Sequence, residues 1–338
     1  MSWWNIFSWF KKQDPEDAQA QYDLAYKLLY EVRNSDEERA LRLLHKAAAQ
    51  EHIAAQCELG FCYGWGKGVK EDLEQAFAWY LKAAEQRDAD AQVEVGKRYI
   101  NGSGVGQDIE LGLLWLGKAL AQDSGLAQHH LASLYMEGKW VAQDTVLALD
   151  YYHKAAEQDM VMSQLHLGNY YAQCQPPDFE QALVWYLKAA AEEEDESMLR
   201  IGDMYAQGKG VIEDHAEAFR WYLRAENACN SEAEQRLAVA YLNGAGVAPD
   251  YEKAERYFQS MALAGDAQAQ YTLAKMAYEG LGPSANVGGV YTWSRLAVLG
   301  GHPQAQKLVD WSAQRLNEQD KGRLEQFLAV FHESTEAA

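Results

Sequence analysis

The sequence has few of the residues that stabilise disulfide-rich or membrane-spanning proteins. It contains four cysteines among 338 residues, too few for a disulfide scaffold. Cys57 and Cys62 lie five positions apart on one predicted helix, where the Cα atoms are near or beyond the limit of about 7 Å for a disulfide. Reduced thiols in the cytoplasm are the simplest interpretation. No run of about 18 apolar residues occurs, so we expect no membrane-spanning helix.

Basic residues are in the minority. Lys and Arg number 30 against 50 Asp and Glu, which gives a formal net charge of −20. Such a surface repels nucleic acid and anionic lipid, because both bind mainly through Lys and Arg contacts to phosphate. We therefore expect no nucleic-acid partner, and the acidic exterior favours a partner with a basic segment.

Motifs for catalysis or for cofactor and metal binding are missing. The sequence has no G-x-x-x-x-G-K-[ST], H-E-x-x-H or C-x-x-C motif, and the glycines from Gly102 to Gly106 follow no predicted strand, so they indicate a turn. His129, His130 and His166 form a possible metal or proton site, but successive first helices should lie about 10 Å apart, too far for shared ligands. We predict no enzyme activity, no cofactor and no metal.

What the sequence does contain is a repeated phrase, Ala-Gln-x-x-Leu-Gly-x-x-Tyr, with a period of about 36 residues. A period in this range predicts stacked helix pairs in one elongated domain, because no unit can bury its apolar face alone. The repeats begin at Ala20, Ala55, Ala91, Ala127, Ser163, Ser197, Ala233, Ala269 and Ala305.

Each unit predicts a helix, a glycine turn and a second helix. Residues at offsets 0, 4, 5 and 8 form a helical stripe, and the small residue at offset 5, such as Gly60, lets another helix approach closely. The Gly-x-Gly-Val turn, as from Gly66 to Val69, supplies positive φ angles. An aromatic pair such as Trp79-Tyr80 marks the second helix. Acidic residues that can cap this helix precede it at Asp72, Asp108, Asp144, Asp178, Asp214 and Asp250.

These in-phase motifs resemble the Sel1-like repeat family, which is related to tetratricopeptide repeats. The resemblance covers residues 20 to 304 and implies an all-α, right-handed solenoid of about eight stacked antiparallel helix pairs. It divides the chain into an aromatic N-terminal segment (1–17), a tetratricopeptide-like first repeat without the glycine turn (18–54), Sel1-like repeats (55–304) and a C-terminal helical cap (305–338). The resemblance also implies an adaptor that binds protein partners, without catalysis by the repeats.

Candidate binding residues lie at offsets 2, 6 and 10 of the first helix, opposite the core stripe, where they would line the concave groove of the solenoid. In the first two units aromatic residues fill these positions, together with Cys57: Tyr22, Tyr26, Tyr30, Phe61 and Trp65. Exposed aromatics of this kind can anchor a partner. Alternatively, the first unit is shifted in phase, or Trp3, Trp4, Phe7 and Phe10 fold back over the patch.

Offset 3 flanks the same groove and runs from acidic to basic along the chain. Its residues are Asp23, Glu58, Glu94, His130, His166, Arg200 and Arg236. Such an edge would orient a polar partner more than hold it. A chance run of solvated residues is the alternative.

The function that we predict is therefore a non-catalytic scaffold that binds a protein or peptide in the groove. By resemblance, a bacterial immunity protein that neutralises a secreted toxin is one alternative. A membrane-surface scaffold anchored through residues 3–12 is another. A secretory signal is not expected, because Lys11 and Lys12 follow the apolar run instead of preceding it.

Overall fold

The repeats fold into pairs of α-helices. A computed structural model of the chain describes residues 14–31 and 36–336, and these residues contain helices but no strands. The predicted all-α solenoid of stacked antiparallel helix pairs is thereby confirmed. The helices are α2 (Ala18–Tyr30), α3 (Glu37–Ala49), α4 (Ile53–Trp65), α5 (Leu73–Glu85), α6 (Ala89–Asn101), α7 (Ile109–Leu120), α8 (Gly125–Glu137), α9 (Thr145–Glu157), α10 (Val161–Gln173), α11 (Phe179–Ala191), α12 (Asp195–Gln207), α13 (His215–Asn227), α14 (Ser231–Asn243), α15 (Tyr251–Leu263), α16 (Ala267–Glu279), α17 (Val287–Leu299), α18 (Gln306–Ala313) and α19 (Glu318–Glu336).

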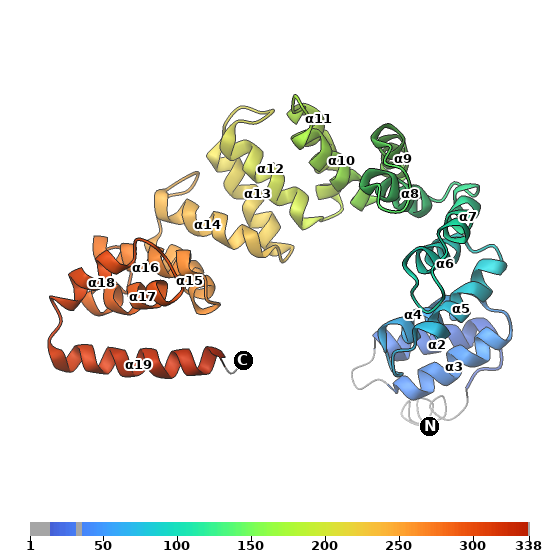
Figure 1. Cartoon of the computed structure of the whole chain (residues 1–338), viewed down its shortest axis with the longest axis horizontal. Coiled ribbons are helices and arrows are strands. Elements are labelled where there is room, and N and C mark those ends of the chain that lie inside the picture. Colours follow the sequence, from blue (N-terminus) through green and yellow to red (C-terminus); the bar gives the residue numbers. More distant parts are fainter. Residues whose placement is uncertain (1–13, 32–35, 337–338) are drawn as a thin grey trace, which may run out of the picture. The chain divides into compact units, whose positions relative to one another are not determined.

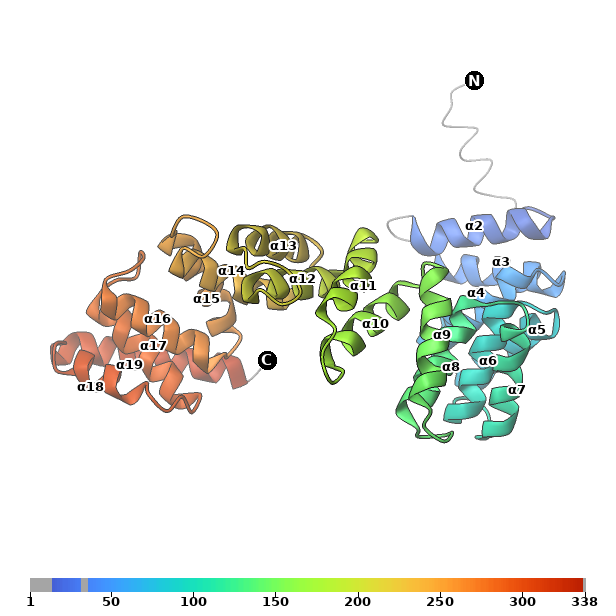
Figure 2. The ribbon, with the colours of Figure 1, turned by 90° about the horizontal axis from the view of Figure 1, so that it is seen from above.

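The chain forms two compact units, residues 1–167 and 168–338. In the first unit α2 packs on α3, α4 on α5, α6 on α7 and α8 on α9, and each pair follows its predecessor in sequence order (Figures 1 and 2). The second unit continues the pattern with α12 on α13, α14 on α15 and α16 on α17, and α19 lies beside α17. No helix in the described ranges is long and apolar enough to cross a membrane.

Helix ends follow the predicted capping chemistry. Asp72, for example, accepts a hydrogen bond from the backbone N–H of Gln75 at 3.0 Å and so caps α5. The five other predicted aspartates cap their helices in the same way. Gly66 and Gly102 end the first helices of their repeats with φ angles of +68° and +69°, because a residue without Cβ adopts the left-handed conformation at little cost.

The small residue at offset 5 makes room for an aromatic ring of the same repeat. A Cβ added at Gly60 would lie 2.7 Å from the ring of Tyr80, and one at Gly202 would lie 2.5 Å from the ring of Tyr222. The predicted close approach of another helix occurs at Gly96, where an added Cβ would lie 2.9 Å from the backbone oxygen of Gly112 in α7. The second residue of each aromatic pair fills the space that glycine leaves.

The second glycine of each turn contacts the preceding repeat. A Cβ added at Gly104 would overlap the backbone carbonyl of Leu73, and one at Gly246 would overlap that of His215. Leu73 and His215 are the first residues of the preceding repeats' second helices. The glycine turn thus caps its own helix and also docks on its neighbour.

Buried glutamines connect successive repeats in the first unit. Gln92 is 3% exposed; its Nε2 donates to the Ala84 carbonyl at 3.1 Å, and its Oε1 accepts from Gln122 Nε2 at 2.9 Å. The Ala84 carbonyl belongs to the preceding repeat and Gln122 follows α7 of the same repeat, so the buried amide is satisfied partly across a repeat boundary. In the second unit Met198 and Glu234 occupy the equivalent positions, whereas Gln270 again donates to the preceding repeat, at the Ala262 carbonyl, at 3.0 Å.

The four cysteines are unpaired, as predicted. Burial raises the pKa of the Cys57 and Cys62 thiols to about 12. Neither thiol is therefore an activated nucleophile at neutral pH.

Candidate partner-binding site

The predicted aromatic residues of the first two repeats form one surface on α2 and α4, which we call the aromatic surface: Tyr22, Tyr26, Tyr30, Phe61 and Trp65. Neighbouring rings lie at centroid distances of 6.1 Å (Tyr22 and Tyr26), 4.7 Å (Tyr26 and Tyr30) and 6.3 Å (Phe61 and Trp65). Trp65 is 76% exposed, Tyr26 43% and Phe61 36%. The structure therefore places large apolar side chains in solvent at the predicted positions.

A hydrogen bond joins the two helices of this surface. Tyr30 Oη donates to Glu58 Oε1 at 2.5 Å, and Lys67 Nζ lies 3.5 Å from the centroid of the Tyr30 ring. Burial and the Glu58 carboxylate raise the pKa of Tyr30, so its hydroxyl stays protonated and keeps donating. Tyr30 and Glu58 thus connect α2 to α4. Tyr26, Phe61 and Trp65 make no hydrogen bond of this kind between the two helices.

Offset 6 shows why Phe61 differs from its equivalents. In three later repeats this position holds a polar side chain that bonds the tyrosine hydroxyl of its own repeat, in the pairs Ser133–Tyr152, Asn169–Tyr186 and Asp203–Tyr222. The other later repeats have Lys97, Val239 and Lys275 there. Phe61 cannot accept a hydrogen bond, and the Tyr80 hydroxyl beneath it makes none within the described residues. Repeat packing therefore does not explain an aromatic side chain at position 61.

A hollow of about 490 Å³ adjoins the aromatic surface, between α4, α5 and α6. Its walls include Phe61, Trp65, Leu73, Tyr80 and Arg98, and we call it the Arg98 pocket. Leu73 is 37% exposed there. The sequence pattern did not single out Leu73, Tyr80 or Arg98. The signal that was present is the charge of Arg98 at a repeat position that is apolar in most repeats, although the first repeat has Lys27 there.

The charged edge residues at offset 3 have partners inside the protein. Lys97 Nζ contacts Glu94 Oε1 at 2.6 Å, Arg200 contacts Glu196 at 3.1 Å, and Arg236 binds Asp203 through two hydrogen bonds of 2.8 and 3.2 Å. Asp23 accepts from Gln19 at 2.8 Å. A partner-orienting role for this edge stays a prediction, and these internal contacts reduce the charge that it offers to a partner.

The histidines at the same edge form a ring cluster. His129 lies at centroid distances of 5.4 Å from both His130 and His166, and its Nδ1 is 2.8 Å from Ser163 Oγ. These rings are closer together than the spacing of about 10 Å between successive first helices suggested, because the side chains extend into the space between the helices. Burial lowers the pKa of His129 to about 4 and of His130 to about 3. His130 is therefore neutral at pH 7 and does not contribute the positive charge that the edge pattern implied.

Metal binding is not indicated by this cluster. The described ranges contain no group of three or more His, Cys, Asp or Glu side chains arranged to hold a metal ion.

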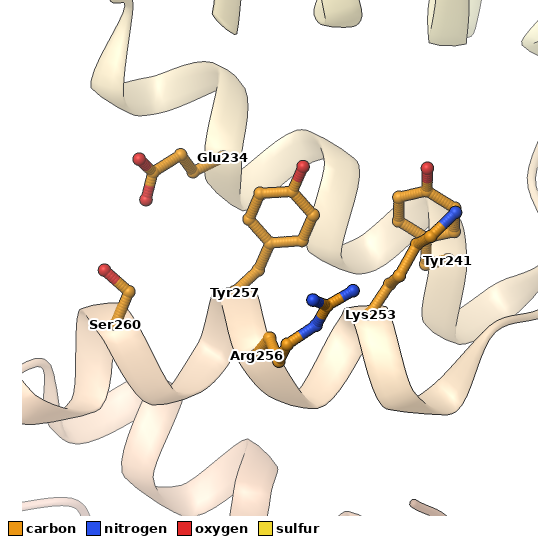
Figure 3. A pocket seen from close by; sticks show the side chains of 6 residues that line it. All are labelled: Glu234, Tyr241, Lys253, Arg256, Tyr257 and Ser260. Atoms are coloured by element: carbon orange, nitrogen blue, oxygen red, sulfur yellow. The ribbon is translucent and has the colours of Figure 1, made fainter.

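A second hollow, of about 410 Å³, lies on α14 and α15 in the other unit (Figure 3). The rings of Tyr241 and Tyr257 stack at 6.2 Å, with Glu234 and Ser260 on one side of Tyr257 and Lys253 near Tyr241. In other repeats a cation covers the equivalent ring of the second helix, as with Lys82, Lys118 and Arg224. Ser260 is too short to cover the Tyr257 ring in this way. A serine at a repeat position that elsewhere holds Lys or Arg is a signal that the sequence contains.

A family comparison identifies these repeats. The model of the Sel1 repeat matches residues 18–52, 53–88, 89–124, 125–160, 161–193, 195–228, 231–266 and 267–288. The chain belongs to the Sel1 repeat family. The first match begins at the first residue of α2 and ends three residues after α3, so it covers this helix pair.

Solved structures with the same fold come from several bacteria. A protective antigen of uropathogenic Escherichia coli with an SLR fold is 25% identical over 94% of this Sel1 repeat chain and 68% of its own, with a TM-score of 0.68. A Sel1 repeat protein from Oxalobacter formigenes is 29% identical over 73% and 98%, with a TM-score of 0.62. An immunity protein from Pseudomonas aeruginosa is 22% identical over 64% and 85%, with a TM-score of 0.49. A search of curated proteins finds no match.

The predicted contacts of the N-terminal aromatics fall on residues that the structure does not describe. Trp3, Trp4, Phe7 and Phe10 lie outside the described ranges. Their folding back over the aromatic surface, or their contact with a membrane, therefore stays a prediction for this Sel1 repeat protein.

Proposed function

We propose that this Sel1 repeat protein is a non-catalytic scaffold that docks a protein or peptide partner on the aromatic surface of its first unit. Sel1 repeats typically mediate protein binding, which supports the general role. The observation that carries the specific site is the exposure of Tyr26, Phe61 and Trp65 at positions where most later repeats have polar side chains. Clustered exposed aromatics are typical of surfaces that become buried by a partner.

Photo-cross-linking tests the location of this docking site. Trp65 is replaced by p-benzoylphenylalanine in one protein and Val146 in a matched control, because Val146 is also in the first unit and is 81% exposed. We expect a discrete cross-linked partner in the native cell from position 65 and none from position 146. Equal products from both positions would contradict a specific site on the aromatic surface.

The other predicted functions stay open to the same experiment. A single partner that is a secreted toxin would favour the immunity alternative, to which the distant Pseudomonas likeness adds no argument. Lipid adducts from position 65 would favour the membrane-surface alternative. A catalytic role has no residue constellation in its favour.

A further inference from the structure

Arg98 is a cation without an ion-pair partner among the described residues, in the wall of the Arg98 pocket. Its Nε is buried and makes no hydrogen bond, and the guanidinium forms no ion pair with any described residue. Its Cζ lies 5.1 Å from the centroid of the Tyr80 ring. Because a buried unpaired polar group costs free energy, an arginine held in this way indicates a ligand that supplies the missing acceptor.

Two departures from the repeat pattern occur together, Arg98 itself and the small residue Gly64 beside it. The equivalent position holds Lys27 in the first repeat, Cys62 in the preceding one, Leu134 in the following one, and Tyr170, Met204, Ala240 and Met276 later. Gly64 of the preceding repeat replaces residues such as Ile100 and Leu242, and a Cβ at Gly64 would lie 3.1 Å from Arg98 Nη2. The cation and the space for it thus occur together at one place in the chain.

A second unpartnered donor lies in the same pocket. The Tyr80 hydroxyl makes no hydrogen bond within the described residues, whereas the equivalent tyrosines bond a polar side chain at offset 6. Burial raises the pKa of Tyr80, so this hydroxyl is a donor at neutral pH. A guanidinium and a phenol hydroxyl together match the two oxygens of a carboxylate.

The charges nearest the pocket favour an anion although the whole protein is acidic. Lys97 and Arg98 provide two positive charges in the lining against the carboxylate of Glu94, which pairs with Lys97 and leaves Arg98 without an ion pair. The Glu58 carboxylate also acts on the Tyr80 hydroxyl, but it is outside the lining and accepts a hydrogen bond from Tyr30. Charges farther away than about 8 to 10 Å are largely screened at physiological salt. The local balance therefore decides which group enters the pocket, while the net charge of −20 acts on the approach of the partner.

We propose that the Arg98 pocket binds an acidic side chain of the protein partner together with a neighbouring apolar side chain. The carboxylate accepts hydrogen bonds from the Arg98 guanidinium and the Tyr80 hydroxyl, and the apolar group packs against Phe61, Trp65 and Leu73. This assignment rests on the proposed function and names the partner chemistry at that site: an acidic and apolar segment.

A small carboxylate tests the pocket directly. The probe is 3-phenylpropionate, compared with the uncharged 3-phenylpropanamide, and binding is followed by the indole N–H signal of Trp65 in protein labelled with ¹⁵N-tryptophan. A fragment of this size should bind in the millimolar range. We expect the carboxylate to bind about tenfold more tightly than the amide, because a charge-assisted hydrogen bond contributes most of the difference.

Variants connect that preference to Arg98. In Arg98→Gln the carboxylate should bind no more tightly than the amide, whereas Arg98→Lys should retain part of the preference. Arg42→Gln is the matched control, because Arg42 lies on α3 of the same unit and pairs with Glu38 outside the pocket. Circular dichroism confirms that each variant keeps its helices.

Three results would overturn the inference: equal binding of the acid and the amide to the wild type, an unchanged preference in Arg98→Gln, or no shift of the Trp65 signal up to about 20 mM probe. The proposed function fails separately. If Tyr26→Ala/Phe61→Ala/Trp65→Ala loses the partner while Arg98→Gln keeps it, the docking surface stands and the carboxylate site is wrong. If Arg98→Gln abolishes the carboxylate preference while the triple variant keeps the partner, the pocket is a ligand site apart from partner docking.

Discussion

Three alanine substitutions in one glycine turn test how repeats are coupled. Gly102, Gly104 and Gly106 lie in one turn, within a segment of five residues, but have different environments. Gly102 and Gly104 have φ angles of +69° and +74°. A Cβ at Gly104 would also overlap the Leu73 carbonyl, whereas a Cβ at Gly106 would have no heavy atom within 4 Å.

The expected costs follow from these environments. Gly102→Ala should lower the free energy of unfolding by about 1 kcal/mol, because alanine is strained in the left-handed conformation. Gly104→Ala bears the same strain and must also displace the backbone of α5, so its cost should reach about 3 kcal/mol or more. Gly106→Ala should be neutral or stabilise the protein by up to about 1 kcal/mol through a less flexible unfolded chain.

Urea unfolding followed by circular dichroism gives the order of the three variants. Hydrogen exchange locates the effect, since amides at the start of α5 should lose protection in Gly104→Ala and keep it in Gly102→Ala. If Gly104→Ala unfolds at the same urea concentration as Gly102→Ala, the second glycine has no role in docking repeats.

Acid should destabilise the His129 and His130 region, because their pKa values of about 4 and 3 lie below the ordinary value of 6.5. The unfolded chain then binds protons first, so stability is full above pH 6.5 and falls as pH drops toward 4. Between pH 7 and pH 5 the wild type should lose about 2 kcal/mol more than His129→Gln/His130→Gln in urea unfolding, after discounting for partial exposure; equal losses would contradict the assignment. Asp203→Ala should destabilise the protein by about 2 kcal/mol by leaving Arg236 unpaired, and a double-mutant cycle with Arg236→Ala should give a clear coupling energy. Gln92→Ala should cost about 1 to 3 kcal/mol in thermal unfolding because the Ala84 carbonyl loses its buried donor; an unchanged midpoint would show that water replaces the amide.

Sequence was sufficient for the aspartate caps and the glycine turns, which depend on local backbone chemistry, but it did not single out the positive φ angles of Glu51 and Arg87 between repeats. An aspartate before a helix caps it, and glycine after a helix adopts positive φ, so Asp72 and Gly66 could be assigned from their positions alone. The period of the repeat then predicted the helix pairs, because each helix has an apolar stripe that neighbouring helices must cover.

Contacts between repeats were harder to predict because they join residues about 30 positions apart. The sequence identified Gly104 as a turn residue but not its neighbour Leu73. It placed His129 and His166 on separate helices, yet side-chain length brings their rings together. Arg98 was not predicted because the offsets expected to face the groove do not include its position, which is usually apolar.

Titration of the cross-linked partner is the most direct test of the docking site. The dissociation constant is measured with the wild type, with Tyr26→Ala/Phe61→Ala/Trp65→Ala, and with Val146→Ala/Ile212→Ala, whose native side chains are 81% and 91% exposed. Loss of the aromatic anchors should weaken binding by about a hundredfold or more, since such residues contribute about 2 kcal/mol each at an interface core, and the control should bind like the wild type. Unchanged affinity in the aromatic variant would contradict the proposed docking site.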